Sequence, residues 1–63
     1  MKTISVPTIR QYNRVKEYCI ENGIIIYASH NSDKNIFLSD SDAEGIQKEH
    51  EFSNYHLTIR KWL

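Results

Sequence analysis

The sequence has a single cysteine, Cys19, and no long apolar run. One cysteine excludes an internal disulfide, and a lone cysteine among apolar neighbours is typical of a small buried side chain in a reducing compartment. The opening segment MKTISVPTIRQY lacks the apolar stretch of a signal peptide, and no segment approaches the roughly 20 apolar residues of a membrane span. We therefore expect a cytoplasmic protein, in the host cytoplasm if a phage encodes it.

The chain also lacks an excess of either charge, because eight Lys and Arg residues balance eight Asp and Glu residues. A net charge of zero argues against a dedicated nucleic-acid binder, which is normally basic, and against a strongly acidic DNA mimic. The charges are unevenly spread, however: both ends of the chain are basic and residues 24–53 are acidic. Such a dipolar surface suits association between copies, although interspersed charge is also common on ordinary surfaces.

The first third of the chain predicts a strand followed by a helix. Residues 2–6 alternate as a strand does, with Ile4 and Val6 on one side. Thr8 followed by Gln11 is a capping box, and Asn22 with Gly23 is a helix stop. Between these signals, apolar residues recur at helical spacing: Ile9, Tyr12, Val15, Cys19 and Ile20.

The rest of the chain predicts a hairpin, a second helix and a last strand. The run Ile24–Tyr27 is apolar on both faces, which is typical of a central strand, and HNSDKN is turn-forming. Residues 41–52 predict a short helix with a Ser41–Glu44 capping box, weakened by Gly45. The last ten residues fit a strand or a helix, and their Thr, Tyr and Ile content favours the strand.

This order, strand–helix–strand–strand–helix–strand, predicts a single small α+β domain over residues 1–63 with an antiparallel sheet, the split βαβ pattern of ferredoxin-like domains. If the first or the last strand proves to be something else, the alternative is a single αββ-containing domain with an antiparallel sheet, made of a helix, a hairpin and a terminal helix. Two helices on one side of the sheet leave its other face uncovered. Since Ile24–Tyr27 is apolar on both sides, we expect a hydrophobic patch there, and hence a homodimer or higher homo-oligomer, or a tight protein partner.

The segment DSDAEGIQKEHE resembles a calcium-binding loop in its spacing. Acids stand at its first, third, fifth and twelfth places: Asp40, Asp42, Glu44 and Glu51. Lys48 at the ninth place is a cation directed at a cation site, and the segment before the loop predicts a strand rather than an entering helix. Acids in a first helical turn explain the same residues, so a metal site is the weaker interpretation and no cofactor is expected.

No catalytic constellation is visible in the sequence. His30, His50 and His56 lack the close spacing of a zinc motif. Cys19 lies on the apolar side of the first helix, where a thiol is inert. We therefore expect a protein that is not an enzyme.

The first helix carries a candidate anion site made of Arg10, Arg14 and Lys16. Two arginines one turn apart near a helix N-terminus suit a phosphate or carboxylate. The favoured alternative is that Arg14 pairs with Glu17 and that Arg10 reaches an acid from the middle segment.

Aromatic residues form the last candidate site. Tyr27, Phe37 and Tyr55 could share one sheet face and stack bases, but no Lys, Arg and Gly framework of the RNA-recognition type surrounds them. Burial in the core or against a second subunit is favoured. The candidate interaction face comprises these three with one further aromatic and two acids: Trp62, Asp42 and Glu44.

These observations favour a small, non-enzymatic regulatory protein that self-associates and binds, as an inhibitor, antitoxin or adaptor, to a larger protein. Nine Ile against two Ala indicates AT-rich coding and is consistent with a phage or mobile-element accessory factor. The alternatives are a nucleotide or nucleic-acid binder that uses Arg10 and Arg14, and a calcium-binding loop at residues 40–51.

Overall fold

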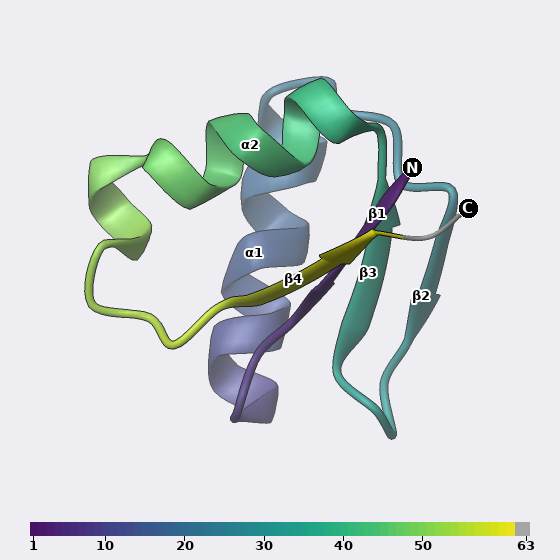
Figure 1. Ribbon diagram of the computed structural model, residues 1–63. Coiled ribbons are helices and arrows are strands. Elements are labelled where there is room, and N and C mark those ends of the chain that lie inside the picture. Colours follow the sequence, from purple (N-terminus) through teal and green to yellow (C-terminus); the bar gives the residue numbers. More distant parts are fainter. Residues whose placement is uncertain (62–63) are drawn as a thin grey trace.

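The computed structural model describes residues 1–61 and has the predicted order of elements (Figure 1). In chain order these are β1 (Lys2–Ser5), α1 (Ile9–Glu21), β2 (Ala28–His30), β3 (Asn35–Leu38), α2 (Asp40–Lys48), a short 3₁₀ helix η1 (His50–Phe52) and β4 (Thr58–Lys61). Among the described residues, no helix is long and apolar enough to cross a membrane.

The four strands form one antiparallel sheet in the order β2-β3-β1-β4. Ile4 in the central strand β1 lies opposite Ile36 of β3 and Ile59 of β4. The predicted α+β architecture with βαββαβ order is therefore confirmed, and the topology is the split βαβ pattern.

The core lies between one face of the sheet and the two helices. Side chains on a strand alternate between faces, so Ile4, Val6, Ile36 and Leu38 point to the same side. That side is covered by buried residues of α1, α2 and η1, which are Tyr12, Val15, Cys19, Ala43, Ile46 and Phe52. Figure 1 shows α1 behind the sheet, which leaves the other face of the sheet without a helix.

The start of α1 follows from local sequence. The Thr8 hydroxyl accepts a hydrogen bond from the Gln11 backbone N–H at 3.1 Å, as the predicted N-cap requires. The second half of the predicted capping box is not formed, because the Gln11 side-chain oxygen is buried without a hydrogen-bond partner among the described residues. The cap is therefore a single hydrogen bond.

The end of α1 also follows the prediction. Gly23 has a φ of 67°, a left-handed conformation that glycine adopts without strain. Its N–H donates to the Ile20 carbonyl at 3.3 Å, and the Ile24 N–H donates to the Cys19 carbonyl at 2.8 Å. These two bonds make the double closure of a Schellman motif, which turns the chain sharply away from the helix.

The predicted central strand at Ile24–Tyr27 is wrong. This segment is a connection without strand structure, and β2 starts only at Ala28, at the edge of the sheet. Ile24 and Ile26 pack against the core, whereas Ile25 and Tyr27 are 64% and 55% exposed. The apolar run therefore reflects a loop that packs along the core on alternate residues, and the central positions belong to β1 and β3. The apolar patch expected on the open face is not built from these residues.

The second helix starts earlier than predicted. Ser39, not Ser41, is its N-cap, and the Ser39 hydroxyl accepts from the Asp42 N–H at 3.2 Å. The backbone at Ser39 is extended, which lets its side chain reach back over the first turn. The helix ends at Lys48, and η1 follows as a separate turn. Of the last ten residues, Thr58–Lys61 form the strand that the sequence favoured.

Candidate functional site: the open face of the sheet

The face of the sheet that no helix covers carries polar, aromatic and basic side chains. Alternation and the strand register assign to this face the residues Ala28, His30, Thr3, Ser5, Asn35, Phe37, Thr58 and Arg60. Among residues 1–61, Ala28 is the one aliphatic residue on this face. It is therefore not the hydrophobic patch that the sequence predicted.

A shallow hollow of about 170 Å³ lies on this face. It is lined by Thr3, Ser5, Asn35, Phe37, Arg60 and Lys61. Within this lining the Ser5 hydroxyl donates a hydrogen bond of 2.6 Å to the side-chain oxygen of Asn35, which lies opposite on β3. This bond fixes the Asn35 amide so that its NH₂ group, which has no partner among residues 1–61, remains available to an incoming ligand.

The aromatic side of the hollow is a pair of rings. The His30 ring meets Phe37 edge to face, with centroids 5.8 Å apart and an interplanar angle of 76°. Such edge contacts are a preferred aromatic geometry. His30, at the end of β2, therefore packs against the Phe37 ring.

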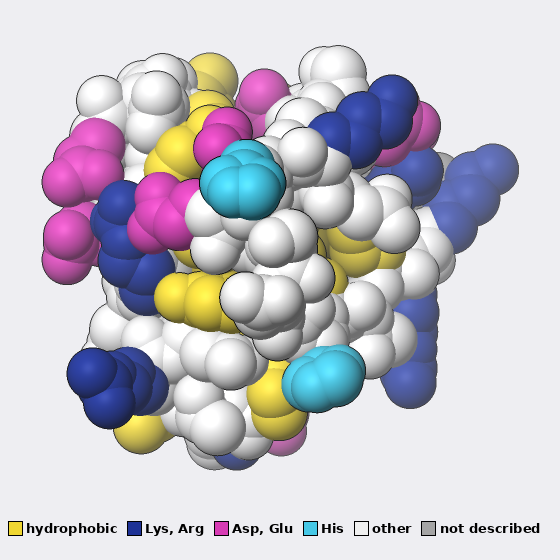
Figure 2. Space-filling model, turned by 90° about the vertical axis from the view of Figure 1, so that its left-hand side faces the viewer, with side chains coloured by type: hydrophobic (Ala, Val, Ile, Leu, Met, Phe, Trp, Pro, Cys, Tyr) yellow, Lys and Arg dark blue, Asp and Glu magenta, His cyan; other side chains and the backbone are white. Residues whose placement is uncertain are grey.

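The two layers of the molecule have opposite charge. The strands and the hairpin turn hold four of the eight Lys and Arg residues and one of the eight Asp and Glu residues, Asp33 in the turn, so that the net side-chain charge there is three positive. The remaining residues, on or beside α1, α2 and η1, carry a net side-chain charge of three negative. Viewed from the side in Figure 2, acidic side chains gather at the upper left, where Lys and Arg side chains also lie, and mainly Lys and Arg lie along the right-hand edge. The formal neutrality of the chain thus conceals a dipole.

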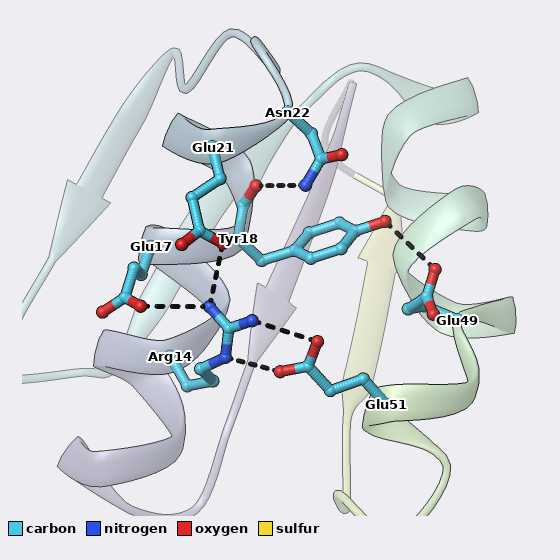
Figure 3. Close-up of polar contacts among 7 residues, drawn as sticks. All are labelled: Arg14, Glu17, Tyr18, Glu21, Asn22, Glu49 and Glu51. Carbon is cyan, nitrogen blue, oxygen red and sulfur yellow. Dashed lines mark hydrogen bonds and ion pairs between the residues drawn. The ribbon is translucent and has the colours of Figure 1, made fainter.

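The acidic layer holds an arginine cluster (Figure 3). The Arg14 guanidinium donates to both carboxylate oxygens of Glu51, from Nη2 at 3.0 Å and from Nε, and its Nη1 lies 3.3 Å from Glu21 and 3.4 Å from Glu17. The hydrogen bond with Glu51 is the main reason that the pKa of Arg14 is raised. The cluster joins α1 to η1.

A second contact joins the same two segments. The Tyr18 hydroxyl donates to Glu49 at 3.1 Å, and this hydrogen bond raises the pKa of Tyr18. The Tyr18 ring packs edge-on against Phe52, with centroids 5.1 Å apart. The segment from α2 to η1 is therefore held to α1 by polar and aromatic contacts together.

The anion site predicted on α1 is not assembled in this structure. Three carboxylates surround Arg14, while Lys16 lies over the Tyr12 ring at 5.2 Å. Arg10 is exposed and forms no ion pair within residues 1–61. The Arg14–Glu17 pair is present as favoured, but it is Arg14, not Arg10, that reaches an acid from the middle of the chain.

The segment that resembled a calcium loop is mostly helix. Asp40 pairs with the N-terminal amine at 2.9 Å, which lowers the pKa of the Asp40 carboxyl, and Glu44 pairs with Lys2 at 3.4 Å. Glu51 belongs to the arginine cluster. Within the described part of the chain, no three His, Cys, Asp or Glu side chains are placed to hold a metal ion. The helical explanation of these acids is the one that the structure supports.

The residues of the predicted interaction face do not gather in one place. Phe37 lies on the open face, Tyr55 packs against Phe52 with centroids 5.1 Å apart, and Tyr27 is exposed on the α1–β2 connection. Asp42 and Glu44 lie on α2, and Trp62 falls outside the described residues. The sequence did not predict the group Thr3, Ser5, Asn35 and Arg60, because only the strand register brings these residues together. The available signal was the alternation within β1, which places Thr3 and Ser5 on one face.

The remaining nucleophile candidate is inert. Cys19 is fully buried in α1, and burial raises the pKa of its thiol to about 11. A thiol in that environment is not a nucleophile near neutral pH.

No protein-family model, curated protein or solved structure matches this chain. The chemistry of the open face therefore carries the functional argument.

Proposed function

We propose that this chain is a small, non-enzymatic binding protein that holds a larger, negatively charged macromolecule against the open face of its sheet. The observation that carries this proposal is the composition of that face: four strands without a single Asp or Glu, with Arg60 and Lys61 beside a hollow that also has a phenylalanine and hydrogen-bonding groups. Covering part of the partner's surface would be its mode of action, as an inhibitor or adaptor, and the cytoplasm would keep its lone thiol reduced.

The distribution of unused charge supports this choice of surface. On the helix layer, Arg14 and five carboxylates form ion pairs with neighbours within the chain or with the N-terminal amine. Arg60 and Lys61 form no ion pair among residues 1–61, and of the two only Lys61 lies near enough to an acid, Asp40, to help lower the pKa of its carboxyl. Cations that the fold does not neutralise attract an anionic partner and speed its association.

The proposal contains no catalytic step. Cys19 is buried, and the histidines of the sequence are dispersed: His30 lies at the end of β2, His50 begins η1, and His56 precedes β4. A site for general acid–base or nucleophilic chemistry needs such groups within hydrogen-bond reach of one another, with a place for the reacting atom.

Affinity capture from the native host lysate tests the proposed function. The bait with Arg60→Glu and Lys61→Glu should lose the partner that the unmodified bait retains. The matched control carries Arg10→Glu and Lys16→Glu, the same charge change on α1, and should retain it. Mass spectrometry and nucleic-acid staining of the eluate identify the partner's class. A partner that is lost from the α1 control and retained by the β4 variant would contradict the proposal.

Self-association stays a prediction. The open face is too polar to supply the apolar surface that was expected to drive it, and the exposed aliphatic and aromatic residues lie elsewhere: Ile9, Ile20, Ile25 and Tyr27. Sedimentation velocity across a concentration series measures it directly.

A further inference from the structure

We propose that the macromolecule held by the open face is single-stranded nucleic acid. In this arrangement the strand crosses β1 and β3, its phosphates lie at Arg60 and Lys61, and one base enters the hollow beside Phe37. This inference rests on the proposed function and names the chemistry of the partner.

The size of the hollow restricts the ligand. Pockets that enclose a small molecule usually measure about 300–1,000 Å³, whereas this one measures about 170 Å³ and opens to solvent. It accommodates one flat ring or one phosphate group and no more. A ligand that gains useful affinity here must extend along the sheet and bind at several points, as a polymer does.

The width of the face favours a single strand over a duplex. Four strands spaced about 4.8 Å apart span roughly 14 Å between the outer strands, and the major groove of B-form DNA is about 12 Å wide. The sheet therefore cannot enter the groove and would meet only phosphates. A single strand lies flat on such a surface with its bases exposed, so that it can use rings and amides as well as cations.

The polar groups of the hollow suit base edges. Thr3 and Ser5 offer hydroxyl groups, and the Ser5–Asn35 hydrogen bond orients the Asn35 amide. An asparagine amide both donates and accepts, as the edge of a base does. Fixing it before binding reduces the entropy lost when the ligand arrives.

The same features fit an acidic protein less well. The centre of a protein–protein interface is usually apolar and rich in aromatic residues, with polar groups at the rim. Here the centre of the face is Thr3, Ser5 and Asn35, and cations and an aromatic ring surround it. The polar centre suits the edges of bases, the aromatic ring suits their flat faces, and the cations suit the phosphates of a nucleotide chain.

The net charge of zero does not oppose this inference, because the charge is separated by layer. A bound strand would meet Arg60 and Lys61 beside the hollow, on strands that carry no Asp or Glu, while the acidic residues of the helix layer lie on the far side of the sheet. Beyond about 10 Å, charges are largely screened at 0.1 M salt. The charge close to the bound strand, rather than the net charge of the whole chain, therefore governs binding.

The test is fluorescence anisotropy with labelled oligothymidine and oligouridine of about ten nucleotides, and with a duplex of the same length. We expect the single strands to bind more tightly than the duplex. Two phosphate contacts predict that log K falls with log salt with a slope of about −1.4. Arg60→Ala with Lys61→Ala should abolish most of that slope and weaken binding at least about ten-fold, whereas Arg10→Ala with Lys16→Ala should change neither.

Substitutions at Phe37 test the stacked base. Phe37→Leu keeps most of the side-chain volume and removes the aromatic ring, so it should weaken binding about five-fold or more, while Phe37→Tyr should not. Circular dichroism verifies that each variant is folded.

Four results would overturn the inference: no binding of either single strand, tighter binding of the duplex, a salt slope that depends on Arg10 and Lys16, or equal binding by Phe37→Leu and the unmodified protein. If no nucleic acid binds but an acidic protein is captured through Arg60 and Lys61, the proposed function stands and this inference fails. If nothing is captured through that face, both fail.

Discussion

The helix layer and the open face of the sheet use their polar side chains in opposite ways. In the helix layer, Arg14 and Tyr18 find their partners within the chain, at Glu51 and Glu49. On the open face the Ser5–Asn35 hydrogen bond is the one polar side-chain contact between strands among residues 1–61, and Arg60 has no ion pair within the same residues. The layers also differ in charge, negative against positive. One layer is satisfied internally, and the other is available to a partner.

Because of this difference, the residues that stabilise the fold and the residues proposed to bind a partner lie in different layers. A chain of this size buries only about 60% of the surface of its unfolded state, so few residues carry its stability. Those residues lie on the helix side of the sheet. Substitutions on the open face should therefore change binding with little change in folding, and substitutions in the helix layer should do the reverse.

The largest effect is expected from a pair of phenylalanines, one in each layer. Phe52 is fully buried in the core, so Phe52→Ala should lower the free energy of unfolding by about 3–5 kcal/mol. Phe37 is only half-buried on the open face, and Phe37→Ala should cost less than half as much. Urea denaturation followed by circular dichroism measures both. Equal losses would show that the open face also carries the stability of the fold.

Alkaline pH should destabilise the helix layer through Cys19. The unfolded thiol ionises near 9 and the folded one near 11, so the raised pKa makes the free energy of unfolding fall as pH rises through that window. Two pKa units correspond to about 2–3 kcal/mol. Urea midpoints between pH 8 and pH 11 measure the loss, and Cys19→Ala should reduce it even if that variant is less stable at pH 8. The same dependence in Cys19→Ala would assign the effect to other groups.

The two glycines should respond in opposite directions. Gly23 has a φ of 67°, so Gly23→Ala forces a left-handed conformation on alanine and should lower the free energy of unfolding by about 1 kcal/mol or more. Gly45 lies within α2 with open space around it, so Gly45→Ala should raise the free energy of unfolding by about 0.5–1 kcal/mol. Thermal unfolding of the two variants side by side checks both signs. A stabilising Gly23→Ala would disprove the Schellman closure of α1.

The smallest effect is expected from the arginine cluster, because exposed ion pairs contribute little. The cluster can instead be recognised by the direction in which added salt changes the melting temperature. Added salt should lower the melting temperature of the unmodified protein slightly by screening Arg14, and raise that of Arg14→Gln, in which Glu17, Glu21 and Glu51 repel one another. Melting curves between about 0.01 M and 1 M salt, where the Debye length falls from about 30 Å to 3 Å, measure this. Arg10→Gln is the control and should behave like the unmodified protein.

Elements with local signals could be predicted from the sequence. Thr8 and Gly23 mark the ends of α1, and the apolar spacing between them indicates its buried side. The apolar run Ile24–Tyr27 misled the prediction, because such a run does not distinguish a central strand from a loop that packs two of its four residues against the core. The choice depends on which strands occupy the centre of the sheet, and that is settled by tertiary pairing.

The candidate site was harder to predict for the same reason. Arg14 and Glu51 are 37 residues apart, so the pair that occupies the expected anion site cannot be read from spacing. The open face combines residues from four strands, and each strand contributes only two of them. Polar residues at alternate places in β1 and β4 predict a solvated face, but the hollow with its ring and cations exists only once the register is known.

The position of β4 has a consequence for the behaviour of the protein in a crowded cell. β4 is an edge strand, and an edge strand can pair with the edge of another chain and start aggregation. A second copy that paired its own β4 antiparallel to this one in the register centred on Arg60 would place the two Arg60 side chains opposite each other with both Lys61 residues close by, and like charges on facing strands repel. The other edge, β2, is only three residues long, which offers little for a second strand to pair with. The two cations proposed to attract a partner would thus also keep the sheet from growing.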